Sequence, residues 1–109
     1  MQLLLDLLAG AFAANAIPHL VKGITGESHM TPFARRSSPP VNVAWAFANI
    51  LLALLLLELA SRRGIFALPA AGELTGPHLV AFLVGALTTA LWLALFWSDP
   101  DARLPWHRD

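Results

Sequence analysis

The residues best suited to chemistry in this sequence are a histidine and several amides that interrupt long apolar stretches. Asn15 and His19 are spaced i,i+4, and Asn42 and Asn49 are spaced i,i+7. In an α-helix, both spacings place the two side chains on one face. Histidine titrates near neutral pH and suits acid–base catalysis or proton relay, whereas an amide orients a ligand or lines a polar path. If the protein is an enzyme, His19 is the expected catalytic residue; the reaction itself is unknown. The candidates for lining a ligand site or a pore are Asn15, His19, Asn42, Trp45, Asn49, Thr88 and Thr89.

The sequence shows no pattern for a metal or a bound cofactor. Cysteine is absent, which excludes disulfides, thiolate zinc sites and iron–sulfur clusters. No P-loop, nucleophile elbow or dinucleotide-binding fingerprint is present. Zinc-site spacing is also missing among the four histidines, His19, His29, His78 and His107. We therefore predict neither a metal nor a cofactor.

The composition indicates that lipid surrounds most of the chain. Hydrophobic residues make up 57% of the 109 residues and charged residues 13%, about half of the roughly 25% that is typical of soluble proteins. The mean hydropathy is +0.63. A water-soluble domain of this size would need a far more polar surface, because its surface-to-volume ratio is high. The net charge of zero argues against a nucleic-acid partner, which requires a basic surface.

Three apolar stretches position the candidate residues, and each is close to the ~20 residues that an α-helix needs to cross a bilayer. Ser38 before Pro39 and Pro40 is typical of a helix start. We predict an all-α fold, an integral membrane bundle of three transmembrane helices at about residues 3–22, 39–62 and 77–97. Residues 1–98 would form one transmembrane domain, and residues 99–109 a short charged C-terminal tail.

The three predicted helices carry hydrogen-bonding side chains at matched depths. With a rise of 1.5 Å per residue, the deeper layer lies about 12 to 15 Å from the connector formed by residues 23–38. This deeper layer comprises Asn15, Asn49, Thr88 and Thr89. A shallower layer comprises His19, Asn42, Trp45 and Trp92. We expect these faces to converge on a polar cluster that opens toward the first connector, with His29 and Thr31 in its lid.

The same residues also have a purely structural interpretation, which is the more frequent one. Asn and Thr in membrane helices commonly hydrogen-bond between helices, at about 0.6 kcal/mol each. Small residues recur at i,i+4 spacing, which allows helices to approach closely. These positions are Gly10 and Ala14, then Ala81, Gly85 and Thr89, then Ala86, Ala90 and Ala94. A three-helix chain needs few such faces, so a spare one favours a homo-oligomer or a partner membrane subunit.

The basic residues favour one orientation. The first connector and the tail share one side of the membrane and hold five basic residues, against Arg62 and Arg63 on the other side. The positive-inside rule therefore places the first connector and the C-terminus in the cytoplasm, with Trp45, Trp97 and Trp106 near that interface. On the opposite side, Glu58 and Arg62 have the i,i+4 spacing of an ion pair. Asp6 is expected to join Arg62 or Arg63 there.

One sequence pattern resembles a group of small uncharacterised bacterial membrane proteins. The pattern is Asn15-x-x-Pro18-His19-x-x-x-Gly23-x-x-Gly26, then Thr31-Pro32-Phe33, then Ser37-Ser38-Pro39-x-x-Asn42-x-x-Trp45-x-x-x-Asn49. It covers about a third of the chain, around the first connector. The resemblance implies a multi-pass protein of the bacterial inner membrane and a site near that connector, and it names no reaction.

Three classes of function remain open from the sequence. The first is a non-enzymatic membrane module, either a structural or interaction subunit or a binder of a lipid-like ligand, whose partners are membrane lipids. The second is a small transporter or channel formed by oligomerisation. The third is an intramembrane enzyme that acts on a lipid or isoprenoid, with His19 as acid or base.

Overall fold

The computed structural model describes residues 1–61 and 76–107 and confirms the predicted bundle. Its elements are α1 (Gln2–Ile24), β1 (His29–Thr31), β2 (Ala34–Ser37), α2 (Pro39–Ser61) and α3 (Gly76–Trp97). Each of the three helices is long and apolar enough to cross a membrane. Their bounds agree closely with the predicted spans, because hydrophobic length and the flanking prolines are local features of the sequence.

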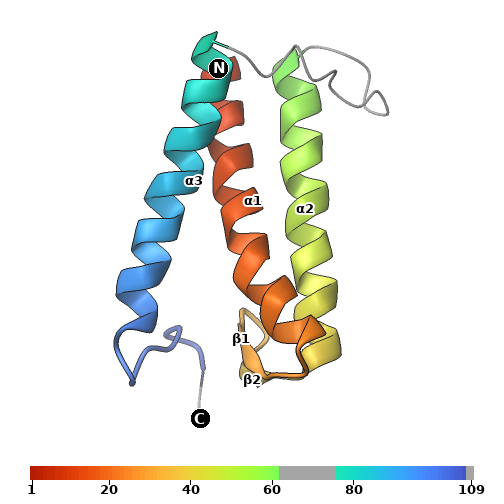
Figure 1. The fold of residues 1–109 in the computed structure, drawn as a ribbon, viewed down its shortest axis with the longest axis vertical. Helices are drawn as coiled ribbons and strands as arrows, with labels where there is room; N and C mark the ends of the chain where they lie inside the picture. The colour runs from red at the N-terminus through yellow and green to blue at the C-terminus, as the bar shows by residue number, and fades with distance from the viewer. Residues whose placement is uncertain (62–75, 108–109) are drawn as a thin grey trace.

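Helix α1 is the centre of the bundle. It contacts α2 along one side and α3 along the other, whereas α2 and α3 make little contact with each other (Figure 1). Helices α1 and α3 run in the same direction and α2 runs against them. Gly85 is the single buried residue of α3, and more than half of the residues of this helix are exposed. An apolar, outward-facing surface of this kind is suited to lipid or to a partner helix.

Glycine brings α1 and α3 together near their N-terminal ends. A Cβ atom at Gly85 would overlap the carbonyl oxygen of Leu7, and one at Gly10 would overlap the carbonyl oxygen of Phe82. The two backbones are therefore in direct contact, as small-residue spacing allows. This contact, called here the glycine crossing, uses two of the predicted small-residue positions within a single chain.

A histidine–carboxylate pair lies beside the glycine crossing. His78 Nδ1 on α3 is 2.5 Å from Asp6 Oδ2 on α1, and Asp6 is 2% exposed. The sequence favours Arg62 or Arg63 as the partner of Asp6. Both arginines lie in the connector at 62–75, which is outside the described residues. The expected Glu58–Arg62 pair lies outside them too, because of Arg62. The Asp6 carboxylate is instead bonded to His78 of α3. This bond adds a polar contact to the close packing of the two backbones.

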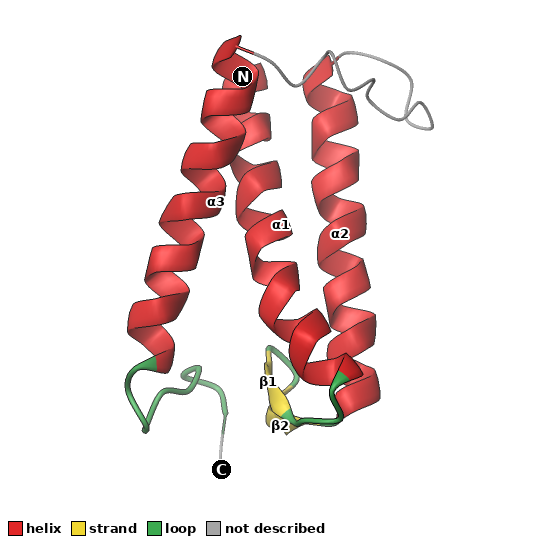
Figure 2. Ribbon diagram, viewed as in Figure 1, coloured by secondary structure: helices red, strands yellow, loops and turns green. Residues whose placement is uncertain are grey.

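The first connector forms a short antiparallel hairpin that the sequence analysis did not predict (Figure 2). Strand β1 pairs with β2 with His29 opposite Ser37 and Thr31 opposite Ala34. The hydroxyl groups of Thr31 and Ser37 are 2.6 Å apart, and Phe33 N–H donates to Thr31 Oγ1 at 3.2 Å. These side-chain bonds fix the turn, which carries too few residues to show strand periodicity in the sequence.

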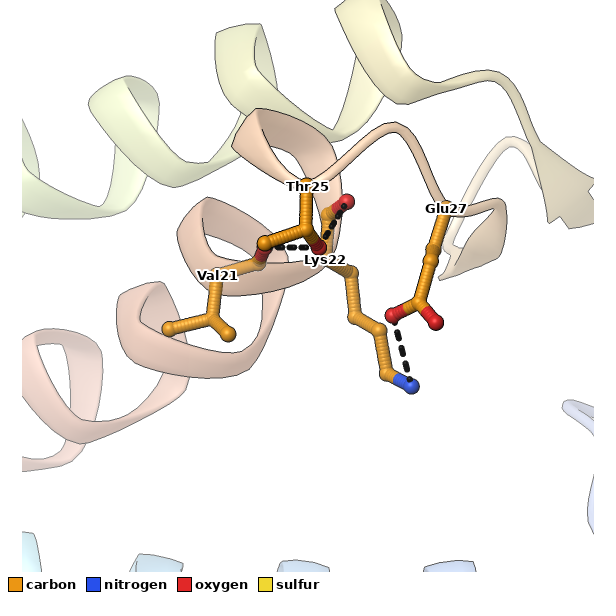
Figure 3. A network of polar contacts seen from close by, with 4 residues as sticks. All are labelled: Val21, Lys22, Thr25 and Glu27. Atoms are coloured by element: carbon orange, nitrogen blue, oxygen red, sulfur yellow. Dashed lines mark hydrogen bonds and ion pairs between the residues drawn. The ribbon is translucent and has the colours of Figure 1, made fainter.

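Side chains next to the hairpin cap both of the helices that flank it. At the end of α1, the Thr25 hydroxyl donates to the carbonyl of Val21 at 2.6 Å, and Lys22 pairs with Glu27 at 3.2 Å (Figure 3). At the start of α2, Val41 N–H donates to Ser38 Oγ at 3.4 Å. The predicted helix start at Ser38 and Pro39 is thus confirmed, and the hairpin is held between two fixed helix ends.

Candidate ligand-binding site

A cavity of about 110 Å³ lies at the end of the bundle where α3 leans away from α1 (Figure 1). All three helices, the hairpin and the tail contribute to its walls. Aromatic rings come from Trp45, Trp92, Phe96 and Trp97, and the polar side chains are Asn15, His19 and Thr31. The other lining residues are Met30, Pro32, Leu93 and Leu104. An aromatic, mostly apolar cavity with a few polar groups is typical of small-molecule sites.

Asn42 holds His19 in the cavity wall. The Asn42 side chain is fully buried, and its Oδ1 is 2.8 Å from His19 Nδ1. Its Nδ2 donates to the carbonyl oxygens of His29, Ser37 and Ser38 at 3.0 to 3.1 Å. One amide therefore links α1, β1 and the start of α2. The predicted proximity of His19 and Asn42 is observed, with Asn42 behind the cavity wall and His19 in it.

A pair of amides, Asn15 and Asn49, lies one layer deeper. Asn15 Nδ2 donates to Asn49 Oδ1 at 3.0 Å, and Asn49 Nδ2 donates to the carbonyl oxygen of Trp45 at 2.8 Å. Asn49 is fully buried, whereas Asn15 is half-buried and lines the cavity. The depth argument placed these two residues at one level, and the structure joins them across α1 and α2.

The third helix contributes aromatic rings to the cavity where threonines were expected. Thr88 is exposed and Thr89 is half-buried, and within the described ranges neither is hydrogen-bonded to α1 or α2. The expected inclusion of Thr88 and Thr89 in the polar cluster is therefore not observed. Because α3 diverges from α1 beyond the glycine crossing (Figure 1), long side chains are needed to reach back, and Trp92 and Phe96 do so, with their rings stacked 5.1 Å apart.

The two expected lid residues take different positions. Thr31 is 1% exposed and lines the cavity. His29 packs against the ring of Trp97, with the ring centroids 4.3 Å apart. It also contacts the His19 ring edge-on, with a centroid distance of 5.2 Å. Burial, assisted by the nearby His19 and Lys22, lowers the pKa of His29 to about 4, against a smaller opposing effect of Glu27. His29 is thus neutral at pH 7.

The C-terminal tail closes one side of the site, which the sequence analysis did not foresee. Leu104 lines the cavity, and Trp106 Nε1 donates to the carbonyl oxygen of Pro32 at the hairpin turn, at 2.8 Å. The tail was predicted as a charged appendage. An apolar residue followed by Pro105 and Trp106 was the available signal for docking, because such residues gain by covering apolar surface.

A second cavity adjoins the first and shares Met30 and Trp97 with it. Its volume is about 230 Å³. Its charged lining residues are Arg35 and Arg36 from β2 and Asp99 from the tail. This cavity is polar and lies on the hairpin side of the aromatic one, and its lining carries two positive side chains and one negative.

Comparisons with known proteins leave the site to be interpreted from its own geometry. No protein-family model matches the sequence, and no curated protein and no solved structure matches the chain. Among the described residues, no group of three or more His, Cys, Asp or Glu side chains is placed to hold a metal ion. The cavity wall offers aromatic rings, the amide of Asn15 and the imidazole of His19, and the amides of Asn42 and Asn49 support these two polar groups from behind.

Proposed function

We propose that this protein is a membrane-embedded binding module that holds the head of a lipid-like amphiphile in the aromatic cavity. The observation that carries the proposal is the cavity itself, which combines four aromatic rings with the fixed polar groups of Asn15 and His19. Sites for whole drug-sized ligands enclose roughly 300–1,000 Å³, so a cavity of about 110 Å³ suits a head group and its first carbons. The remaining chain would lie along the outward-facing surface of α3.

The proposed setting is the bacterial inner membrane, with the hairpin and the C-terminus on the cytoplasmic side. Support comes from the excess of basic residues on the hairpin side. The binding site would then lie near the cytoplasmic interface, where the head groups of membrane amphiphiles are found. A topology reporter fused to the C-terminus tests this orientation, and a periplasmic signal would contradict it.

Native mass spectrometry of the detergent-extracted protein tests the binding proposal. The wild-type protein is expected to retain a bound molecule of defined mass. Leu93→Trp, which fills the cavity, is expected to lose it, whereas Leu95→Trp at a 74% exposed position of the same helix is expected to keep it. Equal retention by all three proteins, or none by the wild type, would overturn the proposal.

An intramembrane enzyme is the second candidate, favoured by the orientation of one imidazole. Asn42 fixes His19 through Nδ1, which leaves Nε2 as the nitrogen able to exchange a proton with a bound lipid. Total lipid profiles of cells that carry wild-type protein or His19→Gln test this alternative. A species that accumulates only with the variant would favour catalysis.

The oligomeric channel receives less support from the geometry. Asn49 is fully buried within one chain and bonded to Asn15, so a pore between chains would not reach it. The mass of the protein in nanodiscs checks this point, because three helices enclose no pore without further subunits.

A further inference from the structure

The hydrogen-bond network determines which donor and acceptor atoms of each polar side chain remain for a ligand. For Asn42, the side-chain nitrogen lies within 3.0 to 3.1 Å of three carbonyl oxygens. The opposite amide orientation would set an oxygen against those three acceptors. The Asn42 oxygen therefore faces His19, and His19 Nδ1 must carry the hydrogen of that bond. In the neutral imidazole, Nε2 is then an acceptor.

The deeper amide pair is oriented by the same reasoning. Asn49 uses its nitrogen to donate to the carbonyl of Trp45, so its oxygen accepts from Asn15. Asn15 thus commits one of its two side-chain N–H groups to α2, and its oxygen and its second N–H remain for the cavity that it lines.

The third polar side chain of the cavity is bonded within the hairpin. The Thr31 and Ser37 hydroxyl groups are 2.6 Å apart, and Thr31 Oγ1 accepts from the Phe33 N–H. The wall formed by α1 and the hairpin therefore presents an acceptor at His19 Nε2, and both an acceptor and a donor at Asn15.

Resting on the function proposed above, we infer that the cavity selects an amphiphile with a neutral hydroxyl head, such as a long-chain or isoprenoid alcohol. A hydroxyl donates to His19 Nε2 or to the Asn15 oxygen. An ionised phosphate or carboxylate has no hydrogen to donate to His19 Nε2. An ammonium head would be desolvated in a cavity that no carboxylate lines within the described chain.

Matched twelve-carbon probes test the inference in nanodiscs. We expect native mass spectrometry to show 1-dodecanol binding about tenfold more tightly than its methyl ether, which corresponds to one hydrogen bond. Dodecyl phosphate and dodecylamine should bind more weakly than the alcohol. In the variants Asn15→Leu and His19→Phe, the alcohol should lose part or all of its higher affinity relative to the ether. The ratio of the two affinities is measured within each variant.

The outcomes separate the inference from the proposed function. Equal binding of alcohol and ether, or a preference for the phosphate or the amine, would overturn the hydroxyl assignment while the binding function stands. Failure of every probe to bind would count against both. A measurement without variants is the ¹⁵N shift of the His19 ring in wild-type protein: the Nδ1–H tautomer is expected, and the Nε2–H tautomer would refute the assignment.

Discussion

The two ends of the α1–α3 pair differ in what separates the helices. At the glycine crossing, backbone meets backbone, and the Asp6–His78 pair lies beside it. At the other end, indole and phenyl rings stand between the helices and border a cavity. The same two helices thus approach backbone to backbone at the crossing and are separated by large aromatic side chains at the other end. The contrast teaches that α3 is fixed at one point and that its tilt from there sets the size of the site.

The glycine crossing should be the most sensitive position in the molecule. Gly85→Ala places a methyl group against the carbonyl of Leu7 and forces α3 outward, at a cost of about 3 kcal/mol, the upper part of the usual overpacking range. Unfolding in mixed micelles measures the loss. Ala90→Leu at an exposed position of α3 is the control and should change stability little. A Gly85→Ala protein as stable as wild type would show that the crossing does not fix α3.

At the open end, Asn42 should matter most. Asn42→Leu removes the bonds to His19 and to three carbonyl groups, and we expect a loss of about 2 kcal/mol from buried groups left without partners. The same unfolding assay, combined with proteolysis of the hairpin, separates a local opening from global loss. An intact hairpin in this variant would contradict the role given to Asn42.

Acid should loosen the open end before the glycine crossing. The pKa of His29 is about 4 in the folded protein against an ordinary 6.5, so protonation favours the unfolded state. The His29 contribution to stability is complete above pH 6.5 and is lost as the pH falls from 6.5 toward 4. His29→Phe, which keeps a ring against Trp97 and the main-chain carbonyl that Asn42 uses, should flatten this part of the Tm–pH profile. An unchanged profile would mean that another group governs it.

The smallest expected effect comes from the deeper amide pair. Asn49→Leu should cost about 0.6 kcal/mol, the average for hydrogen bonds between membrane helices. Adding Asn15→Leu should cost little more, because the two residues share one interhelical bond. A double-mutant cycle measures this coupling. Fully additive losses would show that Asn15 acts through other contacts.

The helices and their polar faces were predictable because they depend on local information. Hydrophobic length and prolines set the spans, and periodicity paired Asn15 with Asn49 and His19 with Asn42 in depth. The small-residue spacing offered two faces of α3, one with Gly85 and one with Ala86, and did not decide which of them meets α1. Periodicity does not give the tilt of a helix, and tilt decides that Trp92 reaches the cavity while Thr89 remains unbonded to the other helices.

The hairpin and the docked tail depend on contacts between segments far apart in the chain. Asn42 bonds back to the His29 carbonyl, and Trp106 bonds to the Pro32 carbonyl. No periodic pattern encodes such single bonds, since each needs two segments already in place. The same holds for Asp6, whose partner His78 lies on another helix, while the expected position of Arg62 and Arg63 on the same side of the membrane favoured the arginines.

The central position of α1 has a consequence for biosynthesis. Of the three helices it is synthesised first, and both α2 and α3 pack on it and hardly on each other. Each new span therefore enters a bilayer that already contains its partner, and the amides of α2 find Asn15 and His19 on arrival. The order of translation is then also the order of assembly: Asn15 and His19 gain their partners when α2 arrives, and Asp6 gains His78 when α3 arrives.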